Sequence, residues 1–300
     1  MTTPRLSVII LSYGTADAVR PCLESLTPDA ASGLVEVILV NNAYPSFAGS
    51  ELRGQFPWLR FIEAMANDGF AAGNNIGLRH AVGEYLLLLN PDTTVPQGTL
   101  AEMLAFMDAH PRVGAATCRV LLGSGEMDGA CHRGFPTPWA SLSYFLKLDR
   151  LFPRSRLFGR YHLTYESLDT THEIDSPSGC FFLTRRKVVD RVGLLDETFF
   201  LYGEDLDWSY RIKQDGWHVM YHPRVSITHL KGMSSGIKGT TAGSSLASLE
   251  ERERALRAFY DAMRIFYQKH LQHRHSAIVT CLIRRAVDLM ESRALRNLTV

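Results

Sequence analysis

The stretch "EYLLLLNPDTTV", residues 84–95, gives the clearest indication of the fold. Its four consecutive leucines favour a strand that is buried on both faces, as in a parallel sheet covered by helices. The apolar run ends at Asn90, and Asp92 follows two residues later. In open α/β sheets, ligands bind outside the carboxyl ends of the strands. We therefore expect Asp92 at the mouth of a ligand crevice.

Apolar runs that favour strands alternate with helical patterns on either side of this stretch. The runs typical of strands are residues 6–13, 35–42, 58–64 and 113–120. The segments with helical spacing are residues 16–26, 71–83 and 97–110. This alternation predicts a mostly parallel sheet with helices on both faces.

The pattern changes after residue 125. The next residues are loop-like, and three later segments favour a strand followed by a helix, a turn into a helix, and a strand: 175–193, 199–216 and 217–223. Residues 231–245 are rich in Gly, Ser and Thr and predict a loop. From Ser245 onward, apolar residues recur at three- and four-residue steps, which predicts two C-terminal helices.

Composition and charge exclude some functions. Hydrophobic residues make up 46% of the 300-residue chain, which is ordinary for a globular protein with a sizeable core. The net charge of +1 excludes a polyanion binder that uses its whole surface. From Lys231 onward, however, 12 Lys and Arg face 6 Asp and Glu, a local charge of +6. This basic tail indicates either an anionic partner, such as a phosphate or a membrane surface, or a solvated helix face.

The cysteines and the N-terminus indicate the compartment. Five scattered cysteines without a C-x-x-C pair favour a reducing environment and give no zinc signal. The chain does not begin with a cationic segment and an apolar run, so we expect no signal peptide. No stretch reaches the ~18 apolar residues that a membrane-spanning helix needs. The sequence therefore predicts a cytoplasmic protein.

Three polar features interrupt apolar surroundings: Asp92, the acidic run of Glu204, Asp205 and Asp207, and His229. Carboxylates and a histidine can hold Mg²⁺ or Mn²⁺, with substrate phosphates completing the coordination shell. A bound cation can neutralise a leaving diphosphate. A second carboxylate, away from the cation, can accept a proton from an attacking hydroxyl group.

Each feature also has a purely structural explanation. A carboxylate after a strand is often a helix N-cap, which would account for Asp92. Acidic residues in a first helical turn complement the helix dipole, which would account for Glu204 and Asp205. A single histidine such as His229 is often a structural residue with satisfied hydrogen bonds. The residues alone leave both explanations open.

Seven segments, taken in order, resemble family 2 glycosyltransferases. They are "LSVIILSYGTADAVRPCLESL", "VEVILVNNA", "NDGFAAGNNIG", "GEYLLLLNPDTTV", "SGCFFLTRR", "VGLLDETFFLYGEDLDWSYRIKQDGW" and "THLKGMSS". The resemblance extends over residues 5–235 and is greatest to the bacterial rhamnosyltransferase-like branch, which builds surface polysaccharides. It implies a GT-A fold, which is an α/β fold with a Rossmann-like sheet. It also implies an inverting transferase that uses a nucleotide-diphosphate sugar.

The resemblance implies roles for the polar features. Asp92 would hold the divalent metal, although many relatives have an acid at the position of Asn90. His229 would supply a further metal ligand. Asp205 would be the general base that takes the acceptor proton, and Glu204 would orient it or help place the acceptor.

The resemblance also implies a set of donor-binding residues. Nucleotide-sugar contacts are expected from Ser12, Tyr13, Gly14, Asn41, Asn67, Phe70, Gly73, Asn74, Asn90 and Asp92. Asn41 stands where relatives usually have Asp, so the resemblance does not fix the nucleotide. The favoured donor is dTDP-L-rhamnose, with UDP- and GDP-sugars as alternatives.

The acceptor is expected to be a glycan or a polyprenyl-diphosphate-linked glycan. Its candidate contacts are Asp128, His132, Arg133, Gly179, Asp207 and Trp208. Residues 141–161 carry five basic residues among apolar ones, and the last helix has a basic amphipathic pattern. Both features suggest a peripheral contact with the inner face of the cytoplasmic membrane. The alternative is that the last helix packs on the catalytic domain or forms a homodimer; no nucleic-acid partner is expected.

The expected organisation has four parts. Residues 1–125 form the nucleotide-sugar-binding half of one GT-A domain, and residues 126–230 form its acceptor-binding half. Residues 231–245 form a flexible loop that is either a lid over the diphosphate or a linker. Residues 246–300 form a helical extension.

Three rival functions use similar residues. A glycoside hydrolase also needs paired carboxylates, but it needs no nucleotide loop. A nucleotidyltransferase would usually show a glycine-rich phosphate loop after the first strand, where this chain has "SYGTAD". A sugar-binding relative without turnover remains open because of Asn41 and Asn90, although Asp92, Asp205 and His229 are all present.

Overall fold

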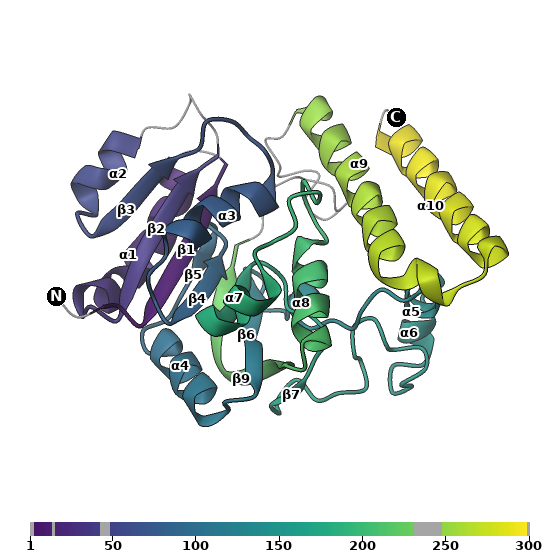
Figure 1. Ribbon diagram of the computed structural model, residues 1–300, viewed down its shortest axis with the longest axis horizontal. Coiled ribbons are helices and arrows are strands. Elements are labelled where there is room, and N and C mark those ends of the chain that lie inside the picture. Colours follow the sequence, from purple (N-terminus) through teal and green to yellow (C-terminus); the bar gives the residue numbers. More distant parts are fainter. Residues whose placement is uncertain (1–2, 14–15, 43–48, 231–247, 299–300) are drawn as a thin grey trace.

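A computed structural model describes residues 3–13, 16–42, 49–230 and 248–298, and Figure 1 shows their arrangement. These residues form a nine-stranded sheet with helices against it, and two long C-terminal helices lie side by side at one end. Gly14 and the predicted loop 231–245 lie outside the described residues.

The first half of the sheet is parallel. Its order is β3-β2-β1-β4, with β1 at Leu6–Ser12, β2 at Val35–Asn41, β3 at Leu59–Glu63 and β4 at Tyr85–Leu89. Every residue of β1 and β4 is buried, because their continuous apolar runs face helices on both sides. The parallel arrangement predicted around residues 84–95 is confirmed.

Helices cover both faces of the sheet. Those of one face are α1 (Ala16–Ala31), α2 (Gly49–Gln55) and α4 (Thr99–Ala109), and those of the other are α3 (Phe70–His80), α7 (Arg186–Val192) and α8 (Glu204–Gln214). Along β1, Val8 and Ile10 join the first core, whereas Ile9 and Leu11 join the second. This alternation is the two-residue period of a strand, and it confirms the predicted α/β fold.

Antiparallel strands enter the second half of the sheet. The remaining strands are β5 (Thr93–Thr94), β6 (Val113–Leu122), β7 (His172–Glu173), β8 (Phe181–Arg185) and β9 (His218–His229). β8 runs antiparallel between β4 and β6, whereas β9 is parallel to β6. The short strands β5 and β7 pair antiparallel with β9. The sheet is therefore mostly parallel, with β8 as the main exception.

β9 is longer than the run 217–223 that predicted it. Its register with β6 shifts between Cys118 and Arg119, so β9 bulges around Pro223, which cannot donate to a ladder. The bulge allows the strand to continue as far as His229.

The connection from β6 to β7 contains only short elements. These are η1 (Gly129–Cys131), α5 (Pro138–Phe145) and α6 (Leu148–Leu151). The rest of residues 125–161, which is more than half of the stretch, has no helix or strand apart from these elements, in agreement with the loop-like sequence.

Two helices follow the sheet, and the first of them packs on α8. They are α9 (Leu249–Phe266) and α10 (Ala277–Leu298), joined by the turns η2 (Tyr267–Leu271) and η3 (Gln272–Arg274). α9 shares an apolar cluster with Leu206 of α8, and α10 packs on α9 through Val287. The two predicted C-terminal helices are confirmed, and the last one packs on its neighbour. No helix within the described ranges is long and apolar enough to cross a bilayer.

Candidate active site

Polar side chains lie at the carboxyl ends of β1 and β2, as predicted. Ser12 and Asn41 are register partners, and both are buried. The N–H of Asn42 donates to the carbonyl of Ser12 at 2.8 Å and extends the pairing by one residue. Tyr13 is exposed, and its hydroxyl donates to Glu251 of α9 at 3.2 Å. The end of β1 therefore contacts the C-terminal helices as well as the sheet.

A short loop before α3 is fixed between β2 and the segment before α8. Asn67 Oδ1 accepts hydrogen bonds from Asn42 Nδ2 at 2.9 Å and from the N–H of Gly69 at 3.2 Å. Gly69 has a φ of 97°, and a Cβ atom there would lie 2.2 Å from the Phe200 carbonyl oxygen. The N–H of Phe70 donates to that oxygen at 2.7 Å. Only glycine fits between these groups, so the predicted donor loop is held in place.

Two predicted donor residues lie inside α3 rather than in this loop. A Cβ atom at Gly73 would lie 2.5 Å from Leu11 Cδ1, so this glycine lets α3 approach β1 closely. The Asn74 side chain is buried and donates to the carbonyl of Phe70 at 2.9 Å. Gly73 therefore positions α3 against β1, whereas the Asn74 bond lies within the first turn of α3.

β5 and β9 bring Asp92 and His229 together. Thr93 and His229 are register partners, which places the preceding Asp92 beside the imidazole ring. Asp92 Oδ1 lies 3.1 Å from His229 Nε2, and Asn90 Nδ2 lies 3.3 Å from the same nitrogen. On the other side of the ring, His229 Nδ1 lies 3.4 Å from Asp128 Oδ2. The histidine therefore lies between two buried carboxylates.

The charge of His229 follows from this position. Burial disfavours the imidazolium, but hydrogen bonds to Asp128 and Asp92 outweigh it and raise the pKa of His229 to about 11. The protonated ring balances the two carboxylates. To become a metal ligand, His229 would have to release this proton.

The groups around Asp92 fit a divalent cation. Asp92 Oδ1 faces the protonated His229 ring at 3.1 Å, whereas Asp92 Oδ2 is buried without a hydrogen-bond partner. A cation beside Oδ2 would satisfy this remaining buried oxygen. Within the described residues, no group of three or more His, Cys, Asp or Glu side chains is arranged to hold a metal. Substrate oxygens would therefore have to complete the shell, which is usual for Mg²⁺.

Asp205 lies in the first turn of α8 and contacts a buried arginine. Arg133 Nη2 donates to Asp205 Oδ2 at 2.6 Å, and the N–H of Gly179 donates to the same oxygen at 3.2 Å. The N–H of Leu206 donates to Oδ1 at 2.7 Å. These three donors orient the carboxylate, while 11% of the Asp205 side chain stays exposed.

Glu204 precedes Asp205 and is more deeply enclosed. Its Oε2 atom is buried without a hydrogen-bond partner. Burial and the nearby charge of Asp205 raise the pKa of Glu204 to about 8. Glu204 is therefore mainly protonated at neutral pH. A protonated carboxyl group in this position can donate a hydrogen bond.

Gly179 and Cys180 connect these groups. The carbonyl of Cys180 accepts from the N–H of Asn90 at 3.1 Å, next to the bond from Gly179 to Asp205. A Cβ atom at Gly179 would lie 2.9 Å from the Phe70 ring. Gly179 and Cys180, the two residues before β8, are therefore a meeting point. They contact the loop that carries Asp92, the candidate base Asp205, and Phe70 of the predicted donor loop.

The structure contradicts two acceptor predictions. Trp208 is fully buried and stacks on Phe182 with 4.9 Å between ring centroids, so it is not available to a sugar. Asp207 is fully buried as well. Its partners are the charged groups of Arg211 and Lys269 and the ring of His270. Both side chains lie on parts of α8 that pack against neighbouring elements, which the acidic sequence run did not reveal.

Asp128 and His132 bind groups other than Asp205. Asp128 lies on the His229 side, where its Oδ1 accepts from the N–H of Ala130 at 3.1 Å and caps η1. His132 is buried with its Nε2 atom 2.6 Å from His172 Nε2. Burial and the neighbouring His172 lower the pKa of His132 to about 4. Of the acceptor candidates, Arg133 and Gly179 are those in contact with Asp205.

Sequence reasoning missed several partners in the site. The sequence predicts Arg133 as an acceptor contact but gives no signal for its hydrogen bond to Asp205. Asn42 binds Asn67, and the only feature of the sequence that pointed to a role for Asn42 is its position next to Asn41. Nothing in the sequence pairs Lys269 with Asp207 of the acidic run.

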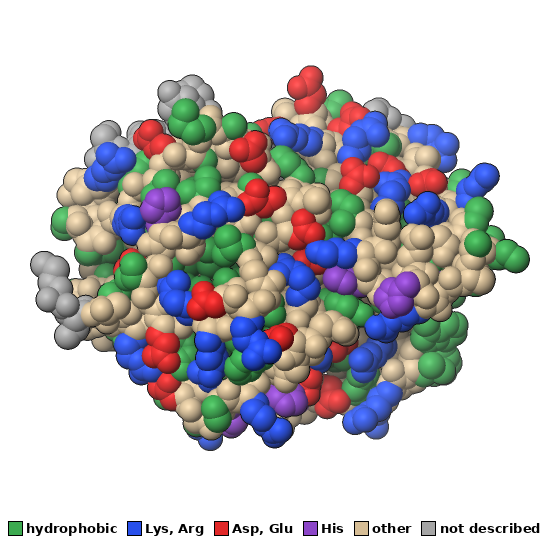
Figure 2. Space-filling view, viewed as in Figure 1, with side chains coloured by type: hydrophobic (Ala, Val, Ile, Leu, Met, Phe, Trp, Pro, Cys, Tyr) green, Lys and Arg blue, Asp and Glu red, His purple; other side chains and the backbone are tan. Residues whose placement is uncertain are grey.

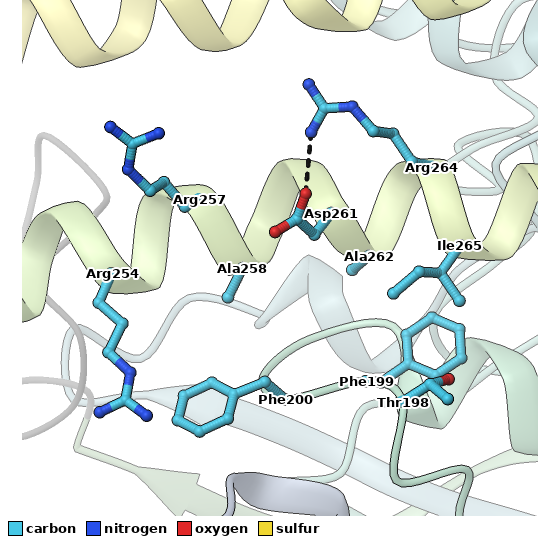
Figure 3. A pocket seen from close by; sticks show the side chains of 10 residues that line it. All are labelled: Thr198, Phe199, Phe200, Arg254, Arg257, Ala258, Asp261, Ala262, Arg264 and Ile265. Carbon is cyan, nitrogen blue, oxygen red and sulfur yellow. Dashed lines mark hydrogen bonds and ion pairs between the residues drawn. The ribbon is translucent and has the colours of Figure 1, made fainter.

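A separate pocket lies between α9 and the segment before α8 (Figure 3). Its lining includes Arg254, Arg257, Arg264, Phe199 and Phe200. Arg254 lies over the Phe200 ring, with 4.2 Å from the guanidinium carbon to the ring centroid. None of the candidate base or metal residues lines this pocket.

Comparison with known proteins gives consistent matches. Residues 4–258 match the model of the family described as "Glycosyltransferase like family 2". The low-salt glycan biosynthesis hexosyltransferase Agl10 of Haloferax volcanii is 24% identical over 233 residues, which are 75% of this chain and 66% of that protein. The chain thus spans slightly less than two thirds of this relative. The N-acetylglucosaminyl-diphospho-decaprenol L-rhamnosyltransferase of Mycobacterium tuberculosis is 24% identical over 246 residues, 78% of each chain.

A solved structure supports the same fold. The mannosyltransferase PcManGT from Pyrobaculum calidifontis, in complex with GDP-Man and Mn²⁺, matches with a TM-score of 0.58 at 18% identity. The match covers 99% of this chain and 74% of that one. The predicted GT-A fold is therefore confirmed. Since the family model covers most of the sequence as well, the chain belongs to glycosyltransferase-like family 2.

Proposed function

We propose that the protein is an inverting glycosyltransferase that moves a sugar from a nucleotide-diphosphate donor to a hydroxyl group of an acceptor. The observation that carries this proposal is the convergence of Asp205, Asn90 and Phe70 on Gly179 and Cys180. A base on one side of a crevice and a cation site on the other are what a single displacement at an anomeric carbon needs.

The donor would lie along the carboxyl ends of β1, β2 and β4. The residues proposed to contact or position it are Ser12, Tyr13, Gly14, Asn41, Asn67, Phe70, Gly73, Asn74, Asn90 and Asp92. In this proposal, residues 1–125 serve the donor and residues 126–230 serve the acceptor. The helices after residue 246 would support α8 from outside.

Asp92 and His229 would hold Mg²⁺ or Mn²⁺. When bound, the cation neutralises the charge that develops on the leaving nucleoside diphosphate. The buried Oδ2 atom of Asp92, which has no hydrogen-bond partner, supports this assignment, as does the Mn²⁺ in the PcManGT complex.

Asp205 would accept the proton of the acceptor hydroxyl as its oxygen attacks the anomeric carbon. The bond from that carbon to the diphosphate breaks on the opposite face, so the configuration inverts. Arg133 and the N–H of Gly179 keep the carboxylate in place. Glu204, protonated at neutral pH, can donate a hydrogen bond to the acceptor without adding a second negative charge.

The proposed sugar is L-rhamnose from dTDP-L-rhamnose, and the proposed acceptor is a glycan or a polyprenyl-diphosphate-linked glycan. The name of the Mycobacterium tuberculosis relative, with its rhamnosyl transfer and its decaprenol-linked sugar, supports both parts. UDP- and GDP-sugars are the alternatives, and the PcManGT complex contains GDP-Man. The proposal includes a cytoplasmic location with peripheral contact to the inner face of the membrane.

A thermal-shift panel tests the donor site. The full chain is melted with dTDP, UDP, GDP or CDP, each in the presence of Mg²⁺, Mn²⁺ or EDTA. A ligand that binds only the folded state raises the melting temperature by mass action. We expect one diphosphate to stabilise the protein and EDTA to remove the gain. If no diphosphate shifts the melting temperature with any metal, the donor site is refuted, and a sugar-binding relative or a hydrolase becomes the better explanation.

A further inference from the structure

Exposed apolar side chains gather between β6 and β7. We define the α5–α6 surface by Leu142, Phe145, Leu146, Leu151, Phe152 and Leu157. Leu151 is 69% exposed, and Leu146 and Leu157 are each 58% exposed. Exposed leucine and phenylalanine so close together in the chain are unusual for a surface that faces only water.

The segment that carries this surface is well anchored. Ala140 and Ser143 of α5 are fully buried, so α5 already has an inner face that packs on the protein. Trp139 Nε1 donates to the carbonyl of Leu157 at 2.9 Å, which ties the end of the segment to its start. The exposed apolar residues therefore form a separate outer face, in addition to the packed one.

Basic residues surround the apolar ones. Lys147, Arg150, Arg154 and Arg156 are exposed, whereas Asp149, the acidic residue of the same stretch, is buried. Figure 2 shows hydrophobic side chains beside Lys and Arg toward the lower right, where Figure 1 places α5 and α6. Arg156 pairs with Glu166 at 3.6 Å, so Lys147, Arg150 and Arg154 carry the positive charge of this apolar face.

We propose that the α5–α6 surface binds an anionic lipid membrane. Segments that lie in the membrane interface combine apolar side chains, which enter the lipid, with Lys and Arg, which meet anionic headgroups. A second copy of the chain is a poorer occupant, because a two-fold dimer would place the same cations against one another. The rival surface is the outer face of α10, which packs on α9 through Val287 and Met290 but exposes Leu282 and Leu289.

The surface is connected to the candidate base. The N–H of Gly134 donates to the carbonyl of Tyr161 at 2.8 Å, so both ends of the segment meet directly after Arg133. Arg133 in turn binds Asp205. Docking at this surface would hold the acceptor side of the site near the lipid, where a polyprenyl-linked acceptor would lie. The inference deepens the proposed function and rests on it for the acceptor, whereas vesicle binding can be measured without it.

Vesicle sedimentation tests the surface. The full chain is mixed with vesicles of phosphatidylcholine alone or of equal parts phosphatidylcholine and phosphatidylglycerol. We expect binding to the anionic vesicles that weakens as salt is raised. The double variant Leu146→Ser and Leu151→Ser should bind at least about tenfold more weakly, since each leucine loses its transfer into lipid. The double variant Arg150→Gln and Arg154→Gln should bind anionic vesicles about fivefold more weakly for each cation removed.

The matched control is Leu289→Ser on α10, where the leucine is 70% exposed. It should bind the vesicles as the unchanged chain does. All variants should keep the nucleotide-dependent thermal shift, which separates this inference from the donor site. Equal vesicle binding by the double leucine variant, or loss of binding only in Leu289→Ser, would overturn the assignment. Salt-sensitive dimerisation at this face without vesicle binding would also overturn it.

Discussion

Arg133 and Asp205 stand 72 residues apart in the chain, yet a hydrogen bond of 2.6 Å joins the guanidinium to the carboxylate. Their side chains are only 12% and 11% exposed. A charged hydrogen bond in such surroundings is strong and directional. The arginine therefore holds one oxygen of Asp205 in place, while the carboxylate keeps some exposure for an incoming hydroxyl group.

Replacing Asp205 by Asn should abolish transfer without loss of donor binding. The amide keeps the shape of the side chain but cannot accept the acceptor proton. We expect kcat to fall by about 10² to 10⁴, with the nucleotide-dependent thermal shift retained. Asp190→Asn, an exposed change on α7, is the matched control and should leave the rate unchanged. Near-normal transfer by Asp205→Asn would exclude this residue as the base.

Replacing Asp92 by Asn should uncouple nucleotide binding from the cation. The variant loses the charge that would hold Mg²⁺ or Mn²⁺ but keeps the size of the side chain. We expect the stabilisation by the nucleoside diphosphate to shrink and to become insensitive to EDTA. Asp128→Asn, on the other side of His229, tests whether any carboxylate beside the ring has this effect. A full, EDTA-sensitive shift in Asp92→Asn would place the cation elsewhere.

The pKa of Glu204 predicts a pH-dependent stability. Burial raises this pKa from 4.5 to about 8, so between these values the folded state holds a proton that the unfolded state has lost. The free energy of unfolding should therefore fall as pH rises through this window, by up to about 1.4 kcal/mol per pH unit, and level off above about pH 8. Urea denaturation from pH 4.5 to 9 measures the slope.

The Glu204→Gln variant isolates this effect. Glutamine cannot ionise, so the part of the slope that Glu204 contributes should disappear. The difference in unfolding free energy between the two proteins should then change steadily with pH up to about 8. Parallel pH profiles for the two proteins would show that Glu204 has an ordinary pKa.

The cluster around Asp207 predicts a large loss of stability. Burial opposes ionisation of this carboxylate, but the hydrogen bond from His270 and the charge of Arg211 outweigh it and lower its pKa to about 2. Asp207→Asn leaves its cationic partners without their counter-charge and should cost about 3–5 kcal/mol. Its contribution should be present above pH 3.8 and be lost as pH falls toward 2.

Asp261→Asn is the matched control for this change. Asp261 also pairs with an arginine, but its side chain is 62% exposed on α9. A surface pair of this kind contributes about 0–1 kcal/mol. Similar small losses in both variants, measured by urea denaturation, would contradict the structural role of Asp207.

The backbone conformation of Gly69 predicts that any side chain at this position destabilises the protein. Its φ of 97° suits glycine, and a Cβ atom would lie 2.2 Å from the carbonyl oxygen of Phe200. Gly69→Ala should therefore destabilise the protein by about 1–3 kcal/mol and weaken nucleotide binding, because the donor loop must move. Gly98→Ala is the control, with a similar φ of 86° but open space around it. Equal effects at both positions would show that the contact with Phe200 is unimportant.

The regular parts of the fold could be predicted because their signals are local. The leucines of residues 86–89 indicate a strand buried on both faces, and the polar residues after β1, β2 and β4 indicate one ligand edge. Parallel strands place these ends together without any knowledge of side-chain packing. The antiparallel direction of β8 has no such signal, because a buried apolar run fits a parallel and an antiparallel strand equally well.

Parts of the site could not be predicted because they depend on long-range contacts. Trp208 follows the acidic run directly, but the rotation of α8 directs its ring into the core. Asp207 has the same residue type as Asp205, and only the tertiary position of Lys269 and His270 distinguishes them. The sequence shows which side chains can do chemistry, whereas packing decides which of them stay accessible.

The pairing of Thr93 with His229 has a consequence for modularity. Residues 1–125 look like a transplantable nucleotide module, but the proposed cation site would use a histidine that lies 137 residues after Asp92. An isolated N-terminal fragment would lack β8, β9 and the imidazole. A chimaera that exchanges donor specificity between relatives must therefore carry the end of β9 with the donor half. Because Asp92 and His229 are so far apart in sequence, a nascent chain could form the contact between them only late in synthesis.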